Sequence, residues 1–504
     1  MSSWSSARTR SLLVALVAGW GVAFAAPRDF MVGTFVDDAQ YAVLAKAIRA
    51  HGTYRVLNLP GAPVETKYPP GWPAVLAAAW SPERPDTANL DRLRFVNLAL
   101  LGPLTALVAL AGVAAFGLAP PLAAALAVAG VAAPVFLRFW TIPMSEPLCL
   151  ALVAAGLVAA TRGRPLGAVL LLVGATYVRT LAAPFLVAVL ILTWRQVGRR
   201  QAAIASGVAA GLLLPWALFL ALHASAVPPA LLGVYGSYGQ WYAASLRADW
   251  TTVLFLVPWQ NAGLLLTALG EGVAGWRWPS VFWLLSSGLA ALVLLWRSRK
   301  SNPAALVGLA LYALVILLWP FAQAGRFVGG VWPLVLLALA AGLPGRRSRF
   351  GLAALALAVS AVAFVRGEGV SAHRRASRAT VPLLERVRQV VPRDSLIAAS
   401  DPALYYLVLG NPTVPNERMR SYRWYRAGFW ATSWGLGDDL WAIVGRYRPA
   451  YLVVERRGAE GRYAAGSLAR QCPGVLREVW QSNGGEYVFA VAPDRPCAPA
   501  ATVH

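Results

Sequence analysis

Two adjacent carboxylates, Asp37 and Asp38, are the residues in this chain whose type and spacing most clearly suggest chemistry. They come shortly after the first apolar segment, so they lie next to a membrane surface. An aspartate at this position also fits a helix cap that complements the helix dipole, and for a single Asp that explanation would prevail. Two neighbouring carboxylates directed at the membrane boundary favour a functional role.

A proline-rich segment, Tyr68-Pro69-Pro70-Gly71-Trp72-Pro73, follows about thirty residues later and is preceded by Lys67. Prolines restrict the backbone to extended and turn conformations at little entropic cost. A rigid loop of this kind could hold Lys67 beside the two aspartates. Alternatively, the segment only leads the chain back into the membrane, with its aromatic side chains in the interfacial belt.

Four further charged residues lie at or between apolar runs. Glu146, in Ser145-Glu146-Pro147, begins an apolar run, where a carboxylate either lines a hydrated cavity or is simply a first-turn acid. Arg326 lies between two late apolar runs, and its guanidinium suits bidentate phosphate binding, although snorkelling to lipid headgroups is the alternative. Arg138 and Arg179 are weaker candidates of the same kind.

The element that must position the aspartates is predicted over residues 39–50. Tyr41, Leu44 and Ile48 recur there at helical spacing with Lys46 and Arg49 elsewhere on the wheel, which is typical of an amphipathic helix in a membrane interface. Asp37 and Asp38 then stand at its N-terminal end.

The composition indicates a polytopic membrane protein, because 58% of the 504 residues are hydrophobic and only 13% are charged. The net charge of +23 raises the question of nucleic-acid binding. The arginines, however, occur in short clusters between apolar runs, as the positive-inside rule requires, so a nucleic-acid partner is excluded. Few histidines and no metal-ligand spacing argue against a metal or another cofactor, although a divalent ion held by the acidic residues stays open.

Apolar runs long enough to cross a membrane number about eleven when the N-terminus is cytoplasmic. Residues 1–26 are either a cleaved signal peptide or a first span, and in both cases the chain from about Pro27 onward lies outside. The segment 165–194 has basic residues on both sides and is expected to form two short helices with Arg179 at the outer tip. The segment 251–275, which contains Trp259 and is followed by Trp276 and Trp278, is expected on the outer surface. The other spans are predicted near 11–28, 93–116, 118–137, 145–161, 203–223, 279–296, 303–320, 328–343 and 350–366.

The chain divides into a membrane part, 1–366, and a C-terminal part, 367–504, with a different pattern. The runs 395–399, 451–454 and 486–490 read as strands and alternate there with helical patterns, which predicts a small α/β domain outside the membrane. Cys472 and Cys497 could pair if this part faces an oxidising compartment, and the sequence leaves that open.

The order of these motifs resembles the GT-C glycosyltransferases. The relevant features are the first span, Asp37-Asp38 followed by Tyr41, the amphipathic helix, the Lys-Tyr-Pro-Pro-Gly-Trp-Pro segment, Ser-Glu-Pro and an arginine between late spans. The resemblance covers roughly residues 10–345 and is greatest to bacterial relatives of the protein O-mannosyltransferases and of the lipid A aminoarabinose transferases. That family often has Asp-Glu where this chain has Asp-Asp, so which carboxylate acts stays open.

The resemblance implies that a sugar is transferred from a polyprenyl phosphate to a lipid, glycan or protein acceptor outside a bacterial inner membrane. Asp37, or else Asp38, would accept the acceptor's proton with inversion at the sugar. Lys67 and Arg326, followed by Arg138 and Arg179, would stabilise the departing phosphate. Tyr41, Tyr68 and Glu146 are expected to line the substrate cavity.

Two alternatives belong to other classes. A transporter or flippase for a lipid-linked or anionic solute would be expected to show internal repeats with binding sites near the bilayer midplane, and no such repeat is visible. A scaffold of the same fold that has lost catalysis would not need both aspartates. The sugar, the acceptor, the lipid length and the oligomeric state are not determined by the sequence.

Overall fold

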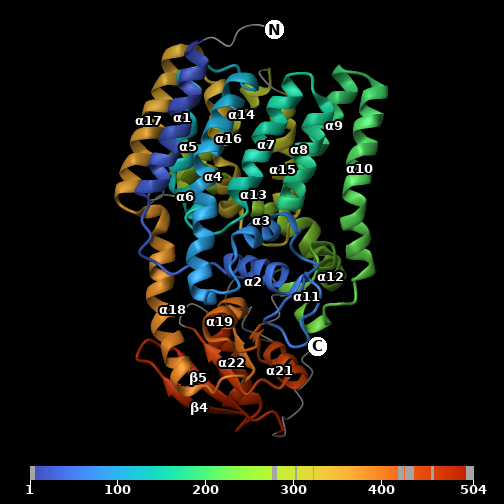
Figure 1. The fold of residues 1–504 in the computed structure, drawn as a ribbon, viewed down its shortest axis with the longest axis vertical. Helices are drawn as coiled ribbons and strands as arrows, with labels where there is room; N and C mark the ends of the chain where they lie inside the picture. Colours follow the sequence, from blue (N-terminus) through green and yellow to red (C-terminus); the bar gives the residue numbers. More distant parts are fainter. Residues whose placement is uncertain are drawn as a thin grey trace.

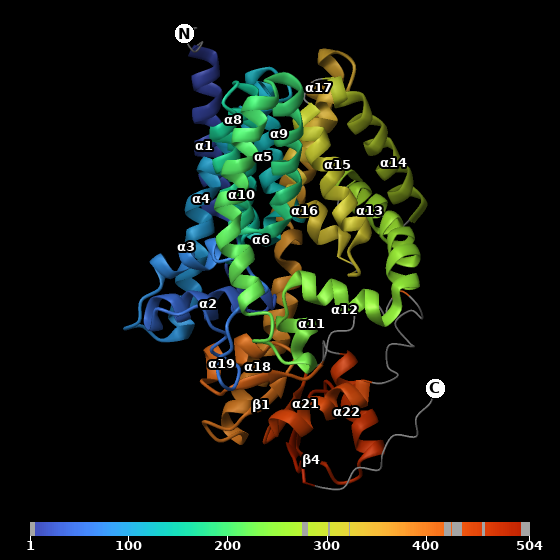
Figure 2. The ribbon, with the colours of Figure 1, turned by 90° about the vertical axis from the view of Figure 1, so that its right-hand side faces the viewer.

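The computed structural model describes residues 6–274, 281–300, 303–321, 323–417, 425, 436–455 and 459–494. A bundle of apolar helices forms one end of the molecule and a small mixed sheet with its helices forms the other (Figure 1). Between them lies a layer of shorter helices, seen from the side in Figure 2. The mostly helical class and the small sheet agree with the prediction from sequence.

Within the described residues, six helices are long and apolar enough to cross a membrane, and a seventh span is added if one bent pair is counted. Several other apolar helices of the bundle are shorter. The chain is an integral membrane protein, and the predicted number of about eleven spans stays a prediction. The bundle helices are α1 (Ser6–Ala25), α4 (Asp86–Ala114), α5 (Pro120–Ala132), α6 (Pro134–Trp140), α7 (Glu146–Thr161), α8 (Pro165–Val178), α9 (Ala183–Gln196), α10 (Arg199–Leu222), α13 (Val257–Ala274), α14 (Val281–Arg297), α15 (Pro303–Leu318), α16 (Ala324–Gly342) and α17 (Gly345–Val365).

The span expected over 118–137 is broken in the structure. α5 and α6 meet at an angle of 68°. Pro134 causes the break, because it disfavours helical backbone at the preceding residue, and Ala133 is extended with ψ of 138°. α6 therefore turns away from α5 and carries Arg138 toward the beginning of α16, where that arginine donates to the Gly325 carbonyl.

The segment 165–194 forms two short helices, as predicted. α8 ends at Val178, Arg179 has extended backbone, and a single 3₁₀ turn at Thr180–Ala182 leads into α9. The two helices pack against each other. Because the helical hydrogen-bond pattern stops at Arg179, its side chain is free to leave the helix surface and reach the neighbouring α7.

The expected outer-surface position of 251–275 differs from the structure. α13 packs against α14, α15 and α16, and a methyl group at Gly270 would lie only 2.1 Å from the Leu284 carbonyl oxygen. The buried Asn261 donates to the carbonyl groups of Ile316 and Trp319 at 2.9 and 2.8 Å. Small residues and a buried amide thus place α13 among the bundle helices. The tryptophans at 276 and 278 lie outside the described residues.

The middle layer contains the predicted amphipathic helix. α2 (Asp37–His51) begins two residues earlier than expected and packs against α3 (Gly71–Ala79). The helix was expected to lie in a membrane interface, but α19 (Pro402–Leu409) of the C-terminal part packs against it. The Lys46 ammonium lies 4.8 Å from the centre of the Tyr406 ring. The rest of this layer comprises η2 (Pro229–Leu231), α11 (Leu232–Tyr235), α12 (Tyr238–Thr251) and the π-helical turn η3 (Thr252–Leu256).

The C-terminal part contains a five-stranded sheet in the order β2-β1-β3-β5-β4. β1 (Ile397–Ala399) pairs in parallel with β2 (Thr413–Pro415) and β3 (Tyr451–Val454), whereas β5 (Tyr487–Val491) pairs antiparallel with β3 and β4 (Leu476–Gln481). The sequence indicated β1, β3 and β5 but not the two edge strands. The helices are η5 (Glu368–Val370), α18 (Ser371–Val390), α19, α21 (Leu436–Tyr447) and α22 (Ala459–Gln471).

The predicted boundary near residue 366 falls between α17 and α18, at Gly367 with a φ of 65°. Division of the chain at this point into separate domains stays a prediction. Cys472 is buried in the core of the C-terminal part, and Cys497 lies outside the described residues.

Candidate active site

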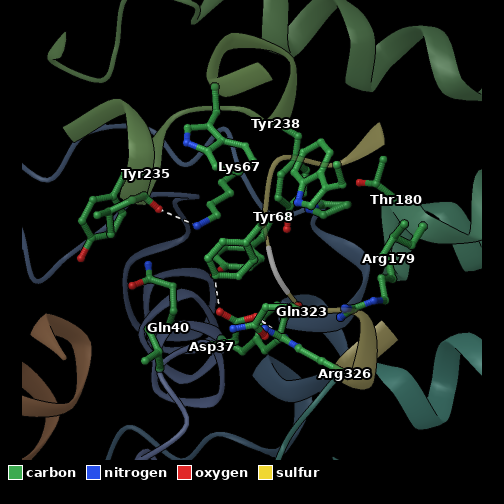
Figure 3. Close-up of a pocket in the computed structure, with 18 of the residues that line it drawn as sticks. Asp37, Gln40, Lys67, Tyr68, Arg179, Thr180, Tyr235, Tyr238, Gln323 and Arg326 are labelled. Atoms are coloured by element: carbon green, nitrogen blue, oxygen red, sulfur yellow. Dashed lines mark hydrogen bonds and ion pairs between the residues drawn. The ribbon is translucent and has the colours of Figure 1, made fainter. Parts of the chain in front are cut away.

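A cavity of about 490 Å³ opens between the bundle, the middle layer and the C-terminal part (Figure 3). Asp37, Gln40 and Tyr41 line it from one face of α2, because residues three and four apart share a helix face. The remaining walls come from residues 67–69, 179–181, 183–184, 233–236, 315–316 and 401–404 together with Phe35, Val36, Tyr238, Trp241, Trp319, Phe321, Gln323, Arg326 and Phe327.

The Asp37 carboxylate is held from two sides. The Arg326 guanidinium forms an ion pair with its Oδ2 atom, and the Tyr68 hydroxyl donates to Oδ1 at 2.8 Å. Burial would raise the pKa of Asp37, but the positive charges of Arg326 and Lys67 and these hydrogen bonds lower it to about 2. Asp37 is therefore a carboxylate at any physiological pH.

The backbone just before Asp37 is strained. Val36 has a φ of 72° and a ψ of −67°, an unfavourable region for a β-branched residue. Such outliers persist only where the surrounding structure enforces them, and they concentrate at functional sites. Here the strained residue precedes the helix that directs Asp37 into the cavity.

Asp38 has different surroundings, although it is the next residue. Its side chain is fully buried, does not line the cavity, and accepts hydrogen bonds from the backbone N–H groups of Gly33, Phe35 and Ala39 at 2.7, 3.0 and 3.0 Å. Burial raises its pKa to about 6, against the lowering effect of the three N–H groups and in the same direction as the Asp37 charge. Asp38 thus fixes the loop that leads into α2.

Glu146 lies behind the cavity wall and connects two arginines. Its Oε1 atom is 3.1 Å from Nη1 of Arg179 and 3.6 Å from Nε of Arg326. The neighbouring Ser145 hydroxyl lies 3.2 Å from Arg179 and 3.1 Å from the Tyr41 hydroxyl. Glu146 was expected to line the substrate cavity, but its side chain is only 2% exposed and does not reach the main cavity. It orients the two guanidinium groups instead.

Lys67 reaches the cavity from the proline-rich loop. Its ammonium group donates to the Val234 carbonyl at 2.8 Å and lies 5.4 Å from the centre of the Tyr68 ring. The loop backbone is fixed by Glu65, whose Oε1 atom accepts from the backbone N–H groups of Lys67 and Tyr68 at 2.5 and 3.1 Å. Burial raises the pKa of Glu65 to about 7, with the backbone N–H groups and Lys67 acting in the opposite direction.

Arg138 does not line the cavity, so the structure does not bring it together with Lys67, Arg179 and Arg326. It donates to the Gly325 carbonyl at 2.6 Å, and its own carbonyl oxygen is 2.9 Å from Nε2 of His373. These contacts tie α6 and α18 to the first turn of α16, which carries Arg326. Arg138 therefore contacts the element that positions the site.

Several cavity residues were not found from sequence, among them Gln40, Tyr235, Tyr238 and Gln323. A signal existed for only one of them. Ser237 and Gln240 form a capping box, with reciprocal hydrogen bonds of 3.2 and 3.1 Å, and this Ser-x-x-Gln pattern marks a helix start at Tyr238. The others depend on contacts between segments far apart in the chain.

A metal site does not emerge from the described residues, where no group of three or more His, Cys, Asp or Glu side chains could hold an ion. The cavity contains two carboxylates, Asp37 and Asp401, three cations and several hydroxyl and amide groups beside an apolar wall. It can bind an anionic group and accept a proton next to it.

No family model matches the sequence, and no curated protein matches it. The fold does match solved structures. ArnT from Cupriavidus metallidurans, bound to undecaprenyl phosphate, gives a TM-score of 0.52 at 14% identity, with 96% of this chain and 98% of that chain covered.

The Archaeoglobus fulgidus oligosaccharyltransferase in complex with Zn and sulfate gives a TM-score of 0.54 at 13% identity, with 96% of this chain and 74% of that chain covered. The oligosaccharyltransferase AglB from the same archaeon, with an inhibitory peptide and a dolichol phosphate, gives 0.51 at 12% identity over 97% and 75%. The matches extend over the bundle and the C-terminal part together. The chain therefore has the fold of the GT-C glycosyltransferases.

Proposed function

We propose that this protein transfers a sugar from a polyprenyl phosphate to an acceptor outside the membrane. The observation that carries the proposal is the Asp37 carboxylate, held by Arg326 and Tyr68 in a cavity that also contains Lys67 and Arg179. A carboxylate and a cluster of cations in one cavity match the two charges that develop in such a transfer.

The reaction has three parts that these side chains serve. The acceptor oxygen attacks the anomeric carbon, the bond from that carbon to the phosphate oxygen breaks with its electron pair going to the phosphate, and Asp37 takes the acceptor proton. Attack opposite to the phosphate inverts the anomeric configuration. Lys67, Arg179 and Arg326 stabilise the negative charge that grows on the departing polyprenyl phosphate.

Arg326 can pair with either the Asp37 carboxylate or the donor phosphate. Its guanidinium pairs with Asp37, which keeps the carboxylate ionised but makes it a weak base. A donor phosphate competes for the same guanidinium, because Arg binds phosphate bidentately. Partial transfer of Arg326 to the phosphate would make Asp37 more basic when the donor is in place.

The lipid part of the donor needs an apolar surface that continues from the site into the bundle. The cavity supplies one, with Leu181 and Pro184 from the α8–α9 region and Val315, Ile316 and Phe327 from α15 and α16. The same fold in ArnT has been observed with undecaprenyl phosphate bound. We further propose that the cavity and the C-terminal part face the outside of a bacterial inner membrane, with the N-terminus in the cytoplasm.

Purified protein incubated with a panel of labelled undecaprenyl phosphate sugars and a lipid extract from the expression host's membranes tests this proposal. Release of undecaprenyl phosphate together with label in an acceptor is the expected result. Movement of intact donor across a proteoliposome membrane without release would identify a transporter and contradict the proposal.

A further inference from the structure

Gln40 is a cavity residue to which the proposed reaction assigns no part. It stands one turn after Asp37 on the same face of α2, and it is 4% exposed. Its Nε2 amide group has no hydrogen-bond partner among the described residues. Buried polar groups nearly always have a partner, so an unpaired donor in a cavity wall indicates an atom that a ligand supplies.

The position of Gln40 separates it from the two arginines of the site. Figure 3 shows Gln40 on one side of Asp37, toward Tyr235, whereas Arg179 and Arg326 come from the opposite side. A neutral amide is also a poor partner for phosphate where three cations are available. The donor phosphate thus leaves Gln40 free for the second substrate.

The chemistry of an amide N–H group limits what that second substrate can present. The N–H donates to a lone pair, and a hydroxyl oxygen has two, so that it can accept from Gln40 with one and attack with the other, whereas a neutral amine has a single lone pair, which the attack itself uses. A hydroxyl can accept from Gln40 and donate its own proton to Asp37 at the same time. One turn of helix brings the two side chains onto the same face, so a single substrate group can contact both.

We propose that Gln40 orients the acceptor by donating to the oxygen of its attacking hydroxyl, so that the acceptor is an alcohol, such as a glycan or lipid hydroxyl, and not an amine. This inference rests on the proposed function. The hydroxyl proton goes to Asp37, the oxygen forms the new glycosidic bond, and the phosphate leaves with the electrons of the old one. Gln40 itself exchanges no proton.

Gln40→Met tests the proposal, because methionine keeps the length of the side chain and removes the donor. With the labelled donor that the wild type uses and increasing amounts of the host lipid extract, the apparent KM for the extract should rise about five- to tenfold, the effect of one lost hydrogen bond. The KM for the donor and the melting temperature should stay within experimental error. Gln201→Met, at an exposed position at the start of α10, is the matched control.

Three outcomes overturn the proposal. They are an unchanged apparent KM for the extract in Gln40→Met, an increase in the donor KM in its place, or a wild-type product linked through nitrogen by mass spectrometry. If the wild-type protein releases no undecaprenyl phosphate with any donor, the proposed function itself is wrong. If the wild type is active and Gln40→Met is unaffected, only the role assigned to Gln40 is wrong.

Discussion

The two sides of the α2 N-terminus show how neighbouring carboxylates come to differ. Asp37 faces the cavity and contacts two side chains, Arg326 and Tyr68, whereas Asp38 faces the preceding loop and contacts only backbone N–H groups. Charges lower the pKa of the first to about 2, and burial raises that of the second to about 6. A helix rotates by about 100° per residue, so adjacency in sequence gives two acids separate surroundings.

Asp37→Asn should have the largest effect, because it removes the base and half of an ion pair while keeping the shape of the side chain. We expect the transfer rate to fall by about 10² to 10⁴, the contribution of a positioned general base. Release of labelled polyprenyl phosphate by equal amounts of folded protein measures this. Full activity in both Asp37→Asn and Asp38→Asn would remove the first-loop aspartates from the mechanism.

Arg326→Ala should weaken use of the donor by about 10² in kcat/KM, because it removes a charge that stabilises the leaving phosphate. Asp37 and Glu146 both lose a cationic partner in this variant, so Arg326→Lys, which keeps the charge, is the matched comparison and should recover part of the loss. Arg138→Gln, outside the cavity, should change the donor KM by less than about threefold. Equal effects at positions 326 and 138 would contradict the distinction between them.

Asp38→Ala should affect stability more than chemistry. Three backbone N–H groups lose their acceptor, so the free energy of unfolding should fall by about 1–3 kcal/mol, with transfer per folded molecule reduced less than about tenfold. Thermal melting in detergent, followed by the transfer assay on the folded fraction, measures both. An unchanged melting temperature with lost activity would make Asp38 the base instead.

Glu65→Gln should have the smallest effect on transfer and the most pH-specific effect on stability. In the wild type the unfolded chain ionises Glu65 near its ordinary pKa of 4.5, but the folded protein keeps it protonated until about pH 7. The folded state therefore binds more protons in this window, and its stability falls as pH rises, by on the order of 1.4 kcal/mol per pH unit at most.

Glutamine at position 65 does not titrate and can still accept from the Lys67 and Tyr68 backbone. The difference in melting temperature between Glu65→Gln and wild type should therefore grow from pH 4.5 to 7 and then level off. A constant difference across this range would show that Glu65 does not stay protonated in the folded protein.

Local patterns explain which parts of this molecule were predictable. Helical spacing identified α2, basic flanks identified the hairpin that turns at Arg179, and the alternation of short strands and helices identified the C-terminal α/β part. Asp37, Lys67, Arg179 and Arg326 were named from charge and position, and the structure brings them around one cavity.

The failures of prediction have a common physical cause, which is packing between distant segments. The segment 251–275 contains Trp259 and is followed by Trp276 and Trp278, a pattern typical of a membrane interface, but Gly270 and Asn261 allow α13 to pack in the bundle. The sequence suggests that Glu146 lines the cavity, but in the structure it pairs with Arg179 and Arg326, which come from two other segments. Gln40 shows no signal in the sequence, because an unpaired amide is visible only once its neighbours are known.

A cryo-EM structure of this protein with undecaprenyl phosphate tests the central claim most directly. We expect the phosphate within hydrogen-bonding distance of Lys67 and of the Arg326 or Arg179 guanidinium, the lipid chain along the wall formed by α9, α15 and α16, and Asp37 and Gln40 facing the remaining space. A phosphate bound outside this cavity, or one that leaves the Asp37–Arg326 pair and Lys67 untouched, would contradict the account.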